Sequence, residues 1–473
     1  MKLKFLFVNA IDPSKAIETM YPPLGIGYLI SSLRKKFGEN TCEFKVINSD
    51  LEEVIRSFSP DIVGISSTSQ NYNRAISCAK IAKKYDLPVI CGGVHITMLP
   101  HSLSRDMNVG VLGEGEATIC DLFGLFLENK ALNKNDLRKI KGIIYWNGNN
   151  SIVSTEKREL ITRINDLPLP ARDMLNIGES TYIFSSRGCP YRCTFCASSR
   201  FWDKVRFFSA EYVVNEIEFL INTYSVKTIS FYDDIFSVDI ERVKKIIELL
   251  KIRNIIGKVR FECAIRANLV NDEIIKLLKE LGVQTISMGL ESGSNEVLKY
   301  LKKDNINLSD NERAIKIIKK HKIPILVGSF IIGSPMEDKK EILTTLKFIK
   351  KIKLDDFALY VLTPFPGTPI WEYARSRGLV SNDMDWDRLN VNFEEVHDMV
   401  IILSEHLTKE EIWKLFMRFK NYKTRRNVYQ LIGKGARNPQ KVPKWVTNKL
   451  IEYLGNAPRV VVRKSHKESI WNL

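Results

Sequence analysis

The sequence lacks a long apolar segment. No run of roughly 18 or more apolar residues, the length that a membrane-spanning helix needs, occurs among its 473 residues. The apolar stretch at residues 1–9 is too short for a signal peptide and predicts a first strand instead. We therefore expect a cytoplasmic protein, in which structural disulfides are rare.

Cysteine is sparse and scattered apart from one group. Five of the eight cysteines stand alone, and the other three are Cys189, Cys193 and Cys196, at spacings i, i+4 and i+7. A structural zinc site normally takes four ligands in paired short spacings, and no second such pair accompanies Cys193 and Cys196. Zinc is therefore disfavoured, and a disulfide is equally so in a chain without a secretory signal.

Positive charge is unevenly distributed. The formal net charge is +16, and the segment from Arg418 to the end holds fourteen Lys and Arg against two acids, a net +12. Its aromatic residues Trp445, Tyr453 and Trp471 stand among these bases. Such a segment is most often a solvated helical cap, and peripheral contact with a membrane or an anionic substrate is the alternative. No recognisable RNA-binding module accompanies it, so nucleic acid is a disfavoured partner.

The three grouped thiols predict an iron–sulfur cluster with one open iron. Three thiolates hold three irons of a four-iron cubane, whereas a purely structural cluster usually takes four cysteines. Arg187, Arg192 and Arg200 surround the group, and we expect their charges to lower the pKa of the thiols.

The CxxxCxxC spacing, with Phe195 just before the third cysteine, resembles the radical S-adenosylmethionine (SAM) enzymes. The resemblance implies that Cys189, Cys193 and Cys196 bind a 4Fe-4S cluster whose open iron is chelated by SAM. It also implies that the cluster cleaves SAM to a 5'-deoxyadenosyl radical and that Phe195 packs near the adenine.

Residues 1–130 show the pattern of a doubly wound parallel sheet of the Rossmann or flavodoxin type. Short β-branched runs at 3–8, 61–66 and 88–93 alternate with helical periodicity at 25–37 and 71–85. Ligands of such sheets bind beyond the carboxyl ends of the strands. Small and polar residues stand at those ends here.

This first segment resembles the cobalamin-binding domain that precedes the radical core in one subfamily of radical SAM proteins. The resemblance implies cobalamin contacts from the residues at the strand ends, namely Ser66, Thr68, Gly92, Gly93, His95, Glu114, Gly115 and Glu116. The histidine that ligates cobalt in other cobalamin proteins is missing, because residues 9–15 after the first strand read Asn-Ala-Ile-Asp-Pro-Ser-Lys. We expect a corrin bound without a protein histidine below cobalt. For His95, a capping or turn role is the alternative.

Residues 131–180 are expected to connect two domains. The runs 142–146 and 151–154 flank Asn-Gly-Asn-Asn, which predicts a hairpin. The proline-rich stretch 166–172 predicts a stiff linker.

Residues 181–395 predict a partial (β/α)6 barrel. Six strands are expected at 181–185, 227–232, 259–264, 284–289, 325–332 and 355–361, with helices at 209–223, 239–251, 271–281, 309–321 and 337–351. Six units are too few to close an eight-stranded barrel. They resemble the open barrel of the radical family, as does the rigid Thr-Pro-Phe-Pro-Gly-Thr-Pro turn at 363–369.

The strand ends of this barrel carry the expected SAM site. Asp234 follows the second strand, Arg266 the third, and Glu291 and Ser292 the fourth. The resemblance implies that Asp234 meets the methionyl amine and that Arg266 and Glu291, with Ser292 beside them, bind the carboxylate and ribose. Any one of them has a rim salt bridge as its alternative role.

Residues 396–473 predict a basic helical C-terminal region, with Thr408 as the N-cap of a helix and Glu411 three residues on. The combined resemblance implies a cobalamin-dependent radical SAM methyltransferase acting on an unactivated carbon of a natural product, lipid or peptide. Its cofactors would be a 4Fe-4S cluster, SAM and cobalamin, and its electron donor a flavodoxin or ferredoxin. A cyclase, ring-contracting or oxidative enzyme without net methylation is the alternative enzyme. A corrin-binding sensor with a structural cluster is the alternative of another class.

Overall fold

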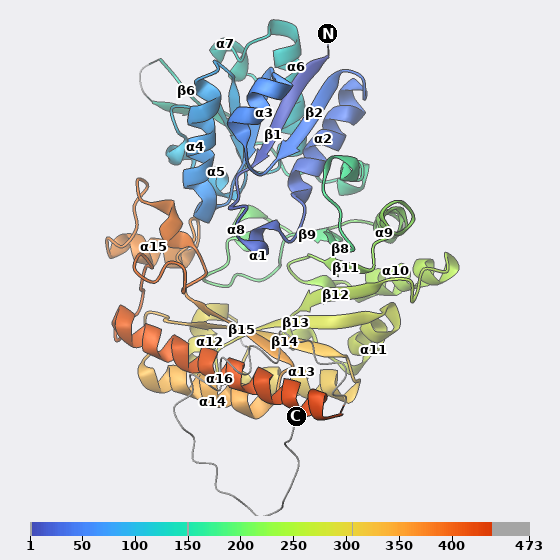
Figure 1. The fold of residues 1–473 in the computed structure, drawn as a ribbon, viewed down its shortest axis with the longest axis vertical. Helices are drawn as coiled ribbons and strands as arrows, with labels where there is room; N and C mark the ends of the chain where they lie inside the picture. The colour runs from blue at the N-terminus through green and yellow to red at the C-terminus, as the bar shows by residue number, and fades with distance from the viewer. Residues whose placement is uncertain (1, 149–150, 305, 438–473) are drawn as a thin grey trace, which may run out of the picture. The chain divides into compact units, whose positions relative to one another are not determined.

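The computed structural model describes residues 2–148, 151–304 and 306–437. The chain divides into two compact units, Met1–Ile412 and Trp413–Leu473. The first unit holds two large β-sheets with their helices, one at each end of the ribbon in Figure 1.

The first sheet has seven strands in the order β2-β1-β3-β4-β5-β6-β7. Its neighbours pair in parallel from β2 to β5, and β6 and β7 are antiparallel. The strands are β1 (Leu3–Asn9), β2 (Cys42–Ile47), β3 (Ile62–Ser66), β4 (Val89–Gly92), β5 (Val109–Val111), β6 (Ile143–Trp146) and β7 (Ile152–Ser154). The parallel part confirms the predicted α/β fold.

Helices cover both faces of this sheet. Along β1 the side chains alternate, so that Phe5 and Phe7 enter one apolar core and Leu6 and Val8 enter the other. The helices are α1 (Ala16–Thr19), α2 (Leu24–Phe37), α3 (Leu51–Phe58), α4 (Tyr72–Lys83), α5 (Val94–Met98), α6 (Gly115–Asn129) and α7 (Lys134–Leu137). Helices α2 and α6 pack together on one face, and α3 and α4 on the other.

The hairpin expected in the connector is part of the first sheet. Strand β6 pairs antiparallel with β5, and β7 pairs with β6. The sheet therefore continues beyond residue 130, where the sequence pattern placed its end. Strand β6 carries three buried side chains, Ile143, Ile144 and Tyr145, which enter the two apolar cores on the faces of the sheet.

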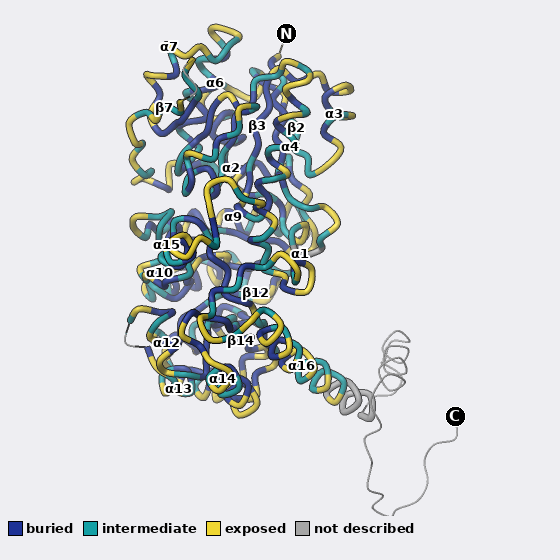
Figure 2. The backbone as a smooth tube through the Cα atoms, turned by 90° about the vertical axis from the view of Figure 1, so that its left-hand side faces the viewer, coloured by how far each residue is buried: buried dark blue, intermediate teal, exposed yellow. Residues whose placement is uncertain are grey.

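The second sheet is an open barrel of six parallel strands in the order β15-β14-β13-β12-β11-β8. They are β8 (Ser180–Ile183), β11 (Thr228–Phe231), β12 (Arg260–Ile265), β13 (Val283–Glu291), β14 (Ile325–Ile332) and β15 (Asp356–Val361). The helices of this half are α9 (Ala210–Tyr224), α10 (Ile240–Ile252), α11 (Asp272–Leu281), α12 (Asn295–Lys302), α13 (Leu308–Lys320) and α14 (Lys339–Ile352). Their apolar faces are buried and their outer faces are exposed (Figure 2). The predicted partial barrel is confirmed.

Side-chain caps set where several barrel helices begin. Asn271 accepts a hydrogen bond from the Ile274 amide at the start of α11. Asn307 and Asp338 form capping boxes at α13 and α14. Each cap satisfies amides that the first helical turn leaves without partners. The predicted helix starts therefore agree with the structure to within two residues.

A segment after the sixth strand returns to the first sheet. Helix α15 (Pro369–Ser376) and the short turn η7 (Trp386–Leu389) lie beside α4 and α5 in Figure 1. Trp386 stacks on Trp371 and meets the edge of Tyr72, and Asn73 donates a hydrogen bond to Asp385 at 2.7 Å. These contacts join the two halves of the first unit.

The C-terminal region begins with helix α16 (Lys409–Arg437). Thr408 and Glu411 bond to each other's backbone amides, which confirms the predicted N-terminal cap. The aromatic residues Trp445, Tyr453 and Trp471 lie outside the described residues. No helix of the described chain has both the length and the apolar character to cross a membrane.

Candidate functional site

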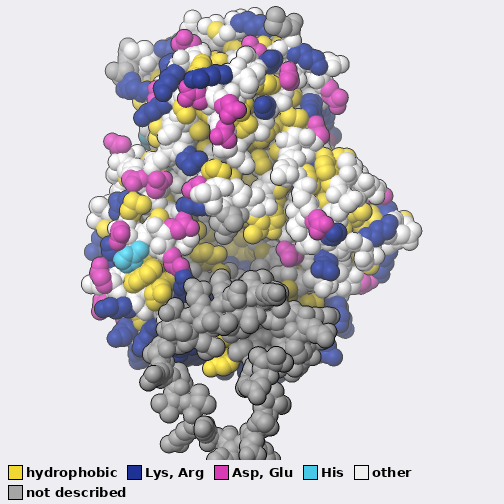
Figure 3. Space-filling view, viewed as in Figure 1, with side chains coloured by type: hydrophobic (Ala, Val, Ile, Leu, Met, Phe, Trp, Pro, Cys, Tyr) yellow, Lys and Arg dark blue, Asp and Glu magenta, His cyan; other side chains and the backbone are white. Residues whose placement is uncertain are grey.

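A cavity of about 410 Å³ lies between the first sheet and the barrel. One wall comes from the carboxyl ends of β3, β4 and β5 and from the first turns of α2 and α6. The other wall comes from β8, the residues after β11 and the start of the cysteine loop. Hydrophobic side chains gather in the hollow between the two halves (Figure 3). The cavity therefore stands where ligands of a doubly wound sheet bind.

Bare backbone forms much of the first wall. Gly25 and Gly113 have open space where a Cβ would stand. Gly93 has φ +107°, and a Cβ there would come within 2.4 Å of the Ser67 carbonyl oxygen. Only glycine fits that conformation without strain. Because the glycines let a broad planar molecule approach the backbone, the wall fits a corrin ring.

Six of the eight residues expected to contact cobalamin line this cavity. They are Ser66, Gly92, Gly93, Glu114, Gly115 and Glu116. Thr68 is exposed and accepts a weak hydrogen bond from Asn71 at 3.3 Å. Thr68 and His95 are absent from the lining.

His95 lies in the hydrophobic core, which corrects its expected place beside the corrin. Its ring stacks on Tyr72 at a centroid distance of 3.8 Å, and Nε2 lies 3.0 Å from the Ser102 hydroxyl. Burial lowers its pKa to about 3, because an imidazolium would lose its hydration there. His95 is the second residue of helix α5, which follows the Gly92-Gly93 turn, and its side chain is fully buried.

Glu114 and Glu116 do more than line the cavity, because they pair with arginines from the barrel half. Arg187 contacts both carboxylates, and Arg206 donates to Glu114 at 2.7 Å. All four side chains are at most 8% exposed. Burial opposes the charge on Arg187, but Glu116 and Glu114 outweigh it and raise its pKa.

This buried quartet joins strand β9 (Ser186–Arg187) and strand β10 (Arg206–Phe207), which flank the cysteine loop, to the first sheet. The sequence pattern did not reveal it, since residues 114 and 187 are 73 positions apart. The indole ring of Trp202 lies over the guanidinium of Arg206 at 5.2 Å.

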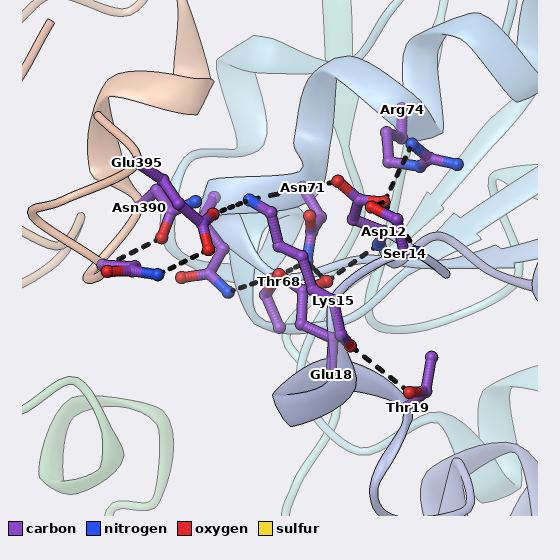
Figure 4. Close-up of polar contacts among 12 residues, drawn as sticks. Asp12, Ser14, Lys15, Glu18, Thr19, Thr68, Asn71, Arg74, Asn390 and Glu395 are labelled. Atoms are coloured by element: carbon purple, nitrogen blue, oxygen red, sulfur yellow. Dashed lines mark hydrogen bonds and ion pairs between the residues drawn. The ribbon is translucent and has the colours of Figure 1, made fainter. Parts of the chain in front are cut away.

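The loop after β1 has its own polar network (Figure 4). Lys15 pairs with Glu395 at 2.9 Å, and Glu18 accepts hydrogen bonds from the Asp12 amide and from Asn71. This is the loop where other cobalamin proteins carry their cobalt-binding histidine. Lys15 is held by the segment before α16, and Glu18 is held by Asn71 just before α4.

The three cysteines share one loop between β9 and α8 (Ser198–Phe201). All three thiols are free, and each of the other two contributes to the electrostatic field at Cys189. No group of three His, Cys, Asp or Glu side chains in the described residues converges on a single metal ion. In a cubane each thiolate binds a different iron, so convergence on one point is not required. The donor set fits a cluster.

Two of the three arginines expected to activate these thiols are engaged elsewhere. Arg187 is paired with Glu114 and Glu116, and Arg192 donates to the Ser199 carbonyl. Burial raises the pKa of the Cys189 thiol to about 11 and raises that of Cys196. The cation beside the loop is Arg266, whose Nη1 lies 3.4 Å from Cys193 Sγ.

Two of the five residues expected to bind SAM have side chains that contact the cysteine loop or the helix that follows it. Arg266 packs over the Tyr191 ring at 3.8 Å and pairs with Asp304. Asp234 lines the cavity and accepts a hydrogen bond from the Ser198 hydroxyl at 2.5 Å. Burial raises the pKa of Asp234.

The other three SAM candidates have structural contacts. Phe195, inside the loop, packs against the apolar core. Glu291 pairs with Lys302 at 2.8 Å, and the Ser292 hydroxyl lies 3.1 Å from that of Thr345. These ion and hydroxyl pairs satisfy the polar groups at the end of β13.

One buried acid at the barrel's strand ends was missed. Glu337 accepts hydrogen bonds from the amides of Gly333 and Ser334, directly after β14. Burial raises its pKa to about 8. The signal for it in the sequence is an acid, Glu337, four residues after Gly333, the glycine that follows β14.

Two family models match the chain in the order of its two sheets. The B12 binding domain matches residues 15–123, and the radical SAM superfamily matches residues 183–349. The chain belongs to the radical SAM superfamily, in the group that has a B12 binding domain before the radical core. Membership implies a 4Fe-4S cluster, SAM and cobalamin as cofactors.

Individual relatives agree with this assignment. An uncharacterized methyltransferase of Pyrococcus horikoshii is 33% identical over 85% of this chain and 88% of its own length. The anaerobic magnesium-protoporphyrin IX monomethyl ester cyclase of Cereibacter sphaeroides is 25% identical over 80% of this chain and 64% of its own. The solved structure of the radical SAM methyltransferase TsrM from Kitasatospora setae, with cobalamin and a 4Fe-4S cluster bound, has a TM-score of 0.66 at 19% identity. The match covers 80% of this chain and 79% of TsrM.

Proposed function

We propose that this protein is a C-methyltransferase that acts on an unactivated carbon of a small-molecule or peptide substrate. One observation carries the proposal: a single cavity is bounded by the glycine-rich strand ends of the first sheet and by Arg187 and Gly188 at the start of the cysteine loop. A corrin in that cavity and a cluster on that loop would face the same space. When bound, the cofactors supply a carbon radical and a methyl donor.

The chain's own residues hold and separate these groups. Cys189, Cys193 and Cys196 are the proposed cluster ligands, and Asp234 and Arg266 stand at barrel strand ends beside them to bind SAM. Phe195, Glu291 and Ser292 are proposed as further SAM-binding residues of that site. The cobalamin-binding domain is proposed to extend to Ser154, because the hairpin completes its sheet.

Anaerobic reconstitution with iron, sulfide and hydroxocobalamin tests the proposal. We expect a cluster absorbance that disappears in Cys193→Ala. It should persist in the control variant Cys78→Ala, because Cys78 is a half-buried free cysteine on α4. The corrin spectrum should be base-off and unchanged in both variants. Reduced protein should cleave SAM to 5'-deoxyadenosine, and failure to do so would favour a corrin-binding sensor.

A cyclase or oxidative enzyme without net methylation is the second candidate. The observation that favours it is the similarity to the Cereibacter sphaeroides cyclase over 80% of this chain. The mass of the product separates the two, because methyl transfer adds one methyl group. Deuterated SAM would mark that group.

A one-electron reductant is required, and we propose a flavodoxin or ferredoxin. Membrane contact through the basic C-terminal region is a further part of the proposal that concerns residues 438–473, beyond the described chain. A flotation assay with anionic liposomes measures it, and absence of binding removes it.

A further inference from the structure

A row of side chains crosses the inner face of the barrel. Tyr182 on β8 lines the cavity and pairs in register with Ser230 on β11. Ser230 pairs with Glu262 on β12, and Glu262 with Thr285 on β13. Residues in register on parallel strands share a face of the sheet. Glu262 therefore faces the same side as Tyr182, and it remains partly exposed there.

Glu262 has hydroxyl partners and lacks a cationic one. Ser230 donates to one carboxylate oxygen at 2.8 Å and Thr285 to the other at 3.2 Å. Within the described chain, no lysine or arginine forms an ion pair with Glu262. This distinguishes it from the buried acids of the same unit that are paired with bases, which are Glu114, Glu116, Glu216, Asp233 and Glu291. Glu262 therefore keeps a partly exposed carboxylate that no base of the described chain neutralises.

Aromatic rings surround the same face. Tyr232, two residues beyond Ser230, is 56% exposed and contacts Tyr21 and Tyr182 at centroid distances of 5.8 and 4.8 Å. Phe184 meets both Tyr182 and Tyr232. Tyr21 comes from the first sheet's loop before α2, and its hydroxyl lies 3.3 Å from that of Ser230.

A set of aromatic rings beside an unpaired carboxylate is suited to a cation. The faces of aromatic rings attract ammonium groups, and a carboxylate gives a charge-assisted hydrogen bond. The neighbours of Glu262 on this face, Ser230 and Thr285 and then Ala264 and Ser287, include no base. Arg260, two residues earlier on the same face, is exposed, and among the described residues it forms no ion pair with Glu262. An anionic group would be repelled by Glu262.

We propose that the substrate enters this barrel with a cationic amine directed at Glu262 and its ring or apolar part among Tyr21, Tyr182 and Tyr232. The inference rests on the proposed function, because it takes the inner face of the barrel as the substrate side of the cofactors. A role for Glu262 in joining strands alone would need neither an exposed Tyr232 nor a partly exposed Glu262.

The test uses three probes that share a phenylethyl group and differ in the charge of its terminal group: 2-phenylethylammonium, 3-phenylpropanamide and 3-phenylpropionate. Calorimetric titration of the reconstituted protein should show the ammonium binding at least about tenfold more tightly than the other two, as one charge-assisted hydrogen bond implies. Glu262→Gln keeps the contacts to Ser230 and Thr285 and should remove that preference. Tyr232→Leu should weaken the ammonium and the amide together.

Glu248→Gln is the matched control, since Glu248 is an exposed acid on α10. It should bind all three probes as the wild type does. Equal affinity for the ammonium and the carboxylate, or a Glu262→Gln variant that binds ammonium as the wild type does, overturns the inference. Corrin and cluster spectra are recorded on the same samples. Loss of those spectra in the wild type would instead overturn the proposed function.

Discussion

The substitution Glu114→Gln gives a direct measure of the buried ionic quartet. Glu114 faces two guanidiniums, Arg187 and Arg206, and its carboxylate also accepts the Ile161 amide at 2.7 Å. The amide side chain has nearly the same shape, but it leaves two buried arginines with one carboxylate between them. Removing one partner of a buried pair costs about 3–5 kcal/mol.

A matched exposed pair provides the control. Glu156 lies 2.6 Å from Lys141, the same distance as Glu116 from Arg187, but its side chain is 71% exposed. An exposed pair contributes roughly 0.2–1 kcal/mol. Glu156→Gln should therefore change the free energy of unfolding several times less than Glu114→Gln does. Glu114 differs from Glu156 in its burial and in its second basic partner, and both differences make its loss the larger one.

Urea unfolding followed by tryptophan fluorescence is the assay, because Trp202 lies over Arg206 and reports on this region. The double variant Glu114→Gln with Arg206→Gln restores the charge balance and should recover part of the loss. If Glu114→Gln unfolds at the same urea concentration as Glu156→Gln, the quartet does not hold the cysteine loop to the first sheet.

Two further predictions concern the cavity and the core. Gly25→Leu should abolish most cobalamin uptake, because the added side chain enters open space in the cavity wall. Its cluster spectrum and its unfolding midpoint should stay unchanged. The control variant Gly148→Leu places the same side chain in open space on the hairpin and should take up cobalamin normally. The pH dependence of stability should differ between the wild type and His95→Gln. The folded pKa of His95, about 3, lies below its unfolded value of about 6.5. The unfolded chain therefore binds more protons at low pH, and the wild type loses stability as the pH is lowered. Between pH 7 and pH 5 this loss amounts to about 2 kcal/mol. The free energy of unfolding is measured by urea titration of both proteins at pH 7 and pH 5. An equal change between the two pH values in the wild type and in His95→Gln would contradict the assignment of His95 as a buried neutral imidazole.

The fold followed from local patterns wherever a strand or helix carried its own signal. The six barrel strands were predictable because each is a short, mostly apolar run in a chain where strands alternate with amphipathic helices. Strand β2 was missed, since only Cys42 and Phe44 of its six residues are buried and the apolar run is broken. The hairpin β6–β7 was recognised as a hairpin, but which sheet it joins depends on a contact with β5, which no local pattern records.

The candidate site divides in the same way. The cysteine motif and the glycines of the strand ends are read from adjacent residues, because their role depends on backbone geometry. The partners of the charged residues cannot be read from adjacent residues, because the sequence does not show what a carboxylate contacts. Glu114 was expected to contact the corrin, and in the structure it pairs with two arginines. His95 illustrates the same limit, since stacking on Tyr72 is a tertiary contact.

The quartet also bears on how the two cofactor sites are held together. Arg187 stands two residues before Cys189, and Glu114 and Glu116 bracket Gly115 in the cavity wall. The same four side chains therefore connect the proposed cluster loop to the proposed corrin wall. Since a buried network of balanced charge has few alternative arrangements of similar energy, a shift of the corrin wall should displace the cysteine loop with it. We therefore expect this network, together with the contacts of α15 and η7, to contribute to the spacing between the two proposed cofactor sites.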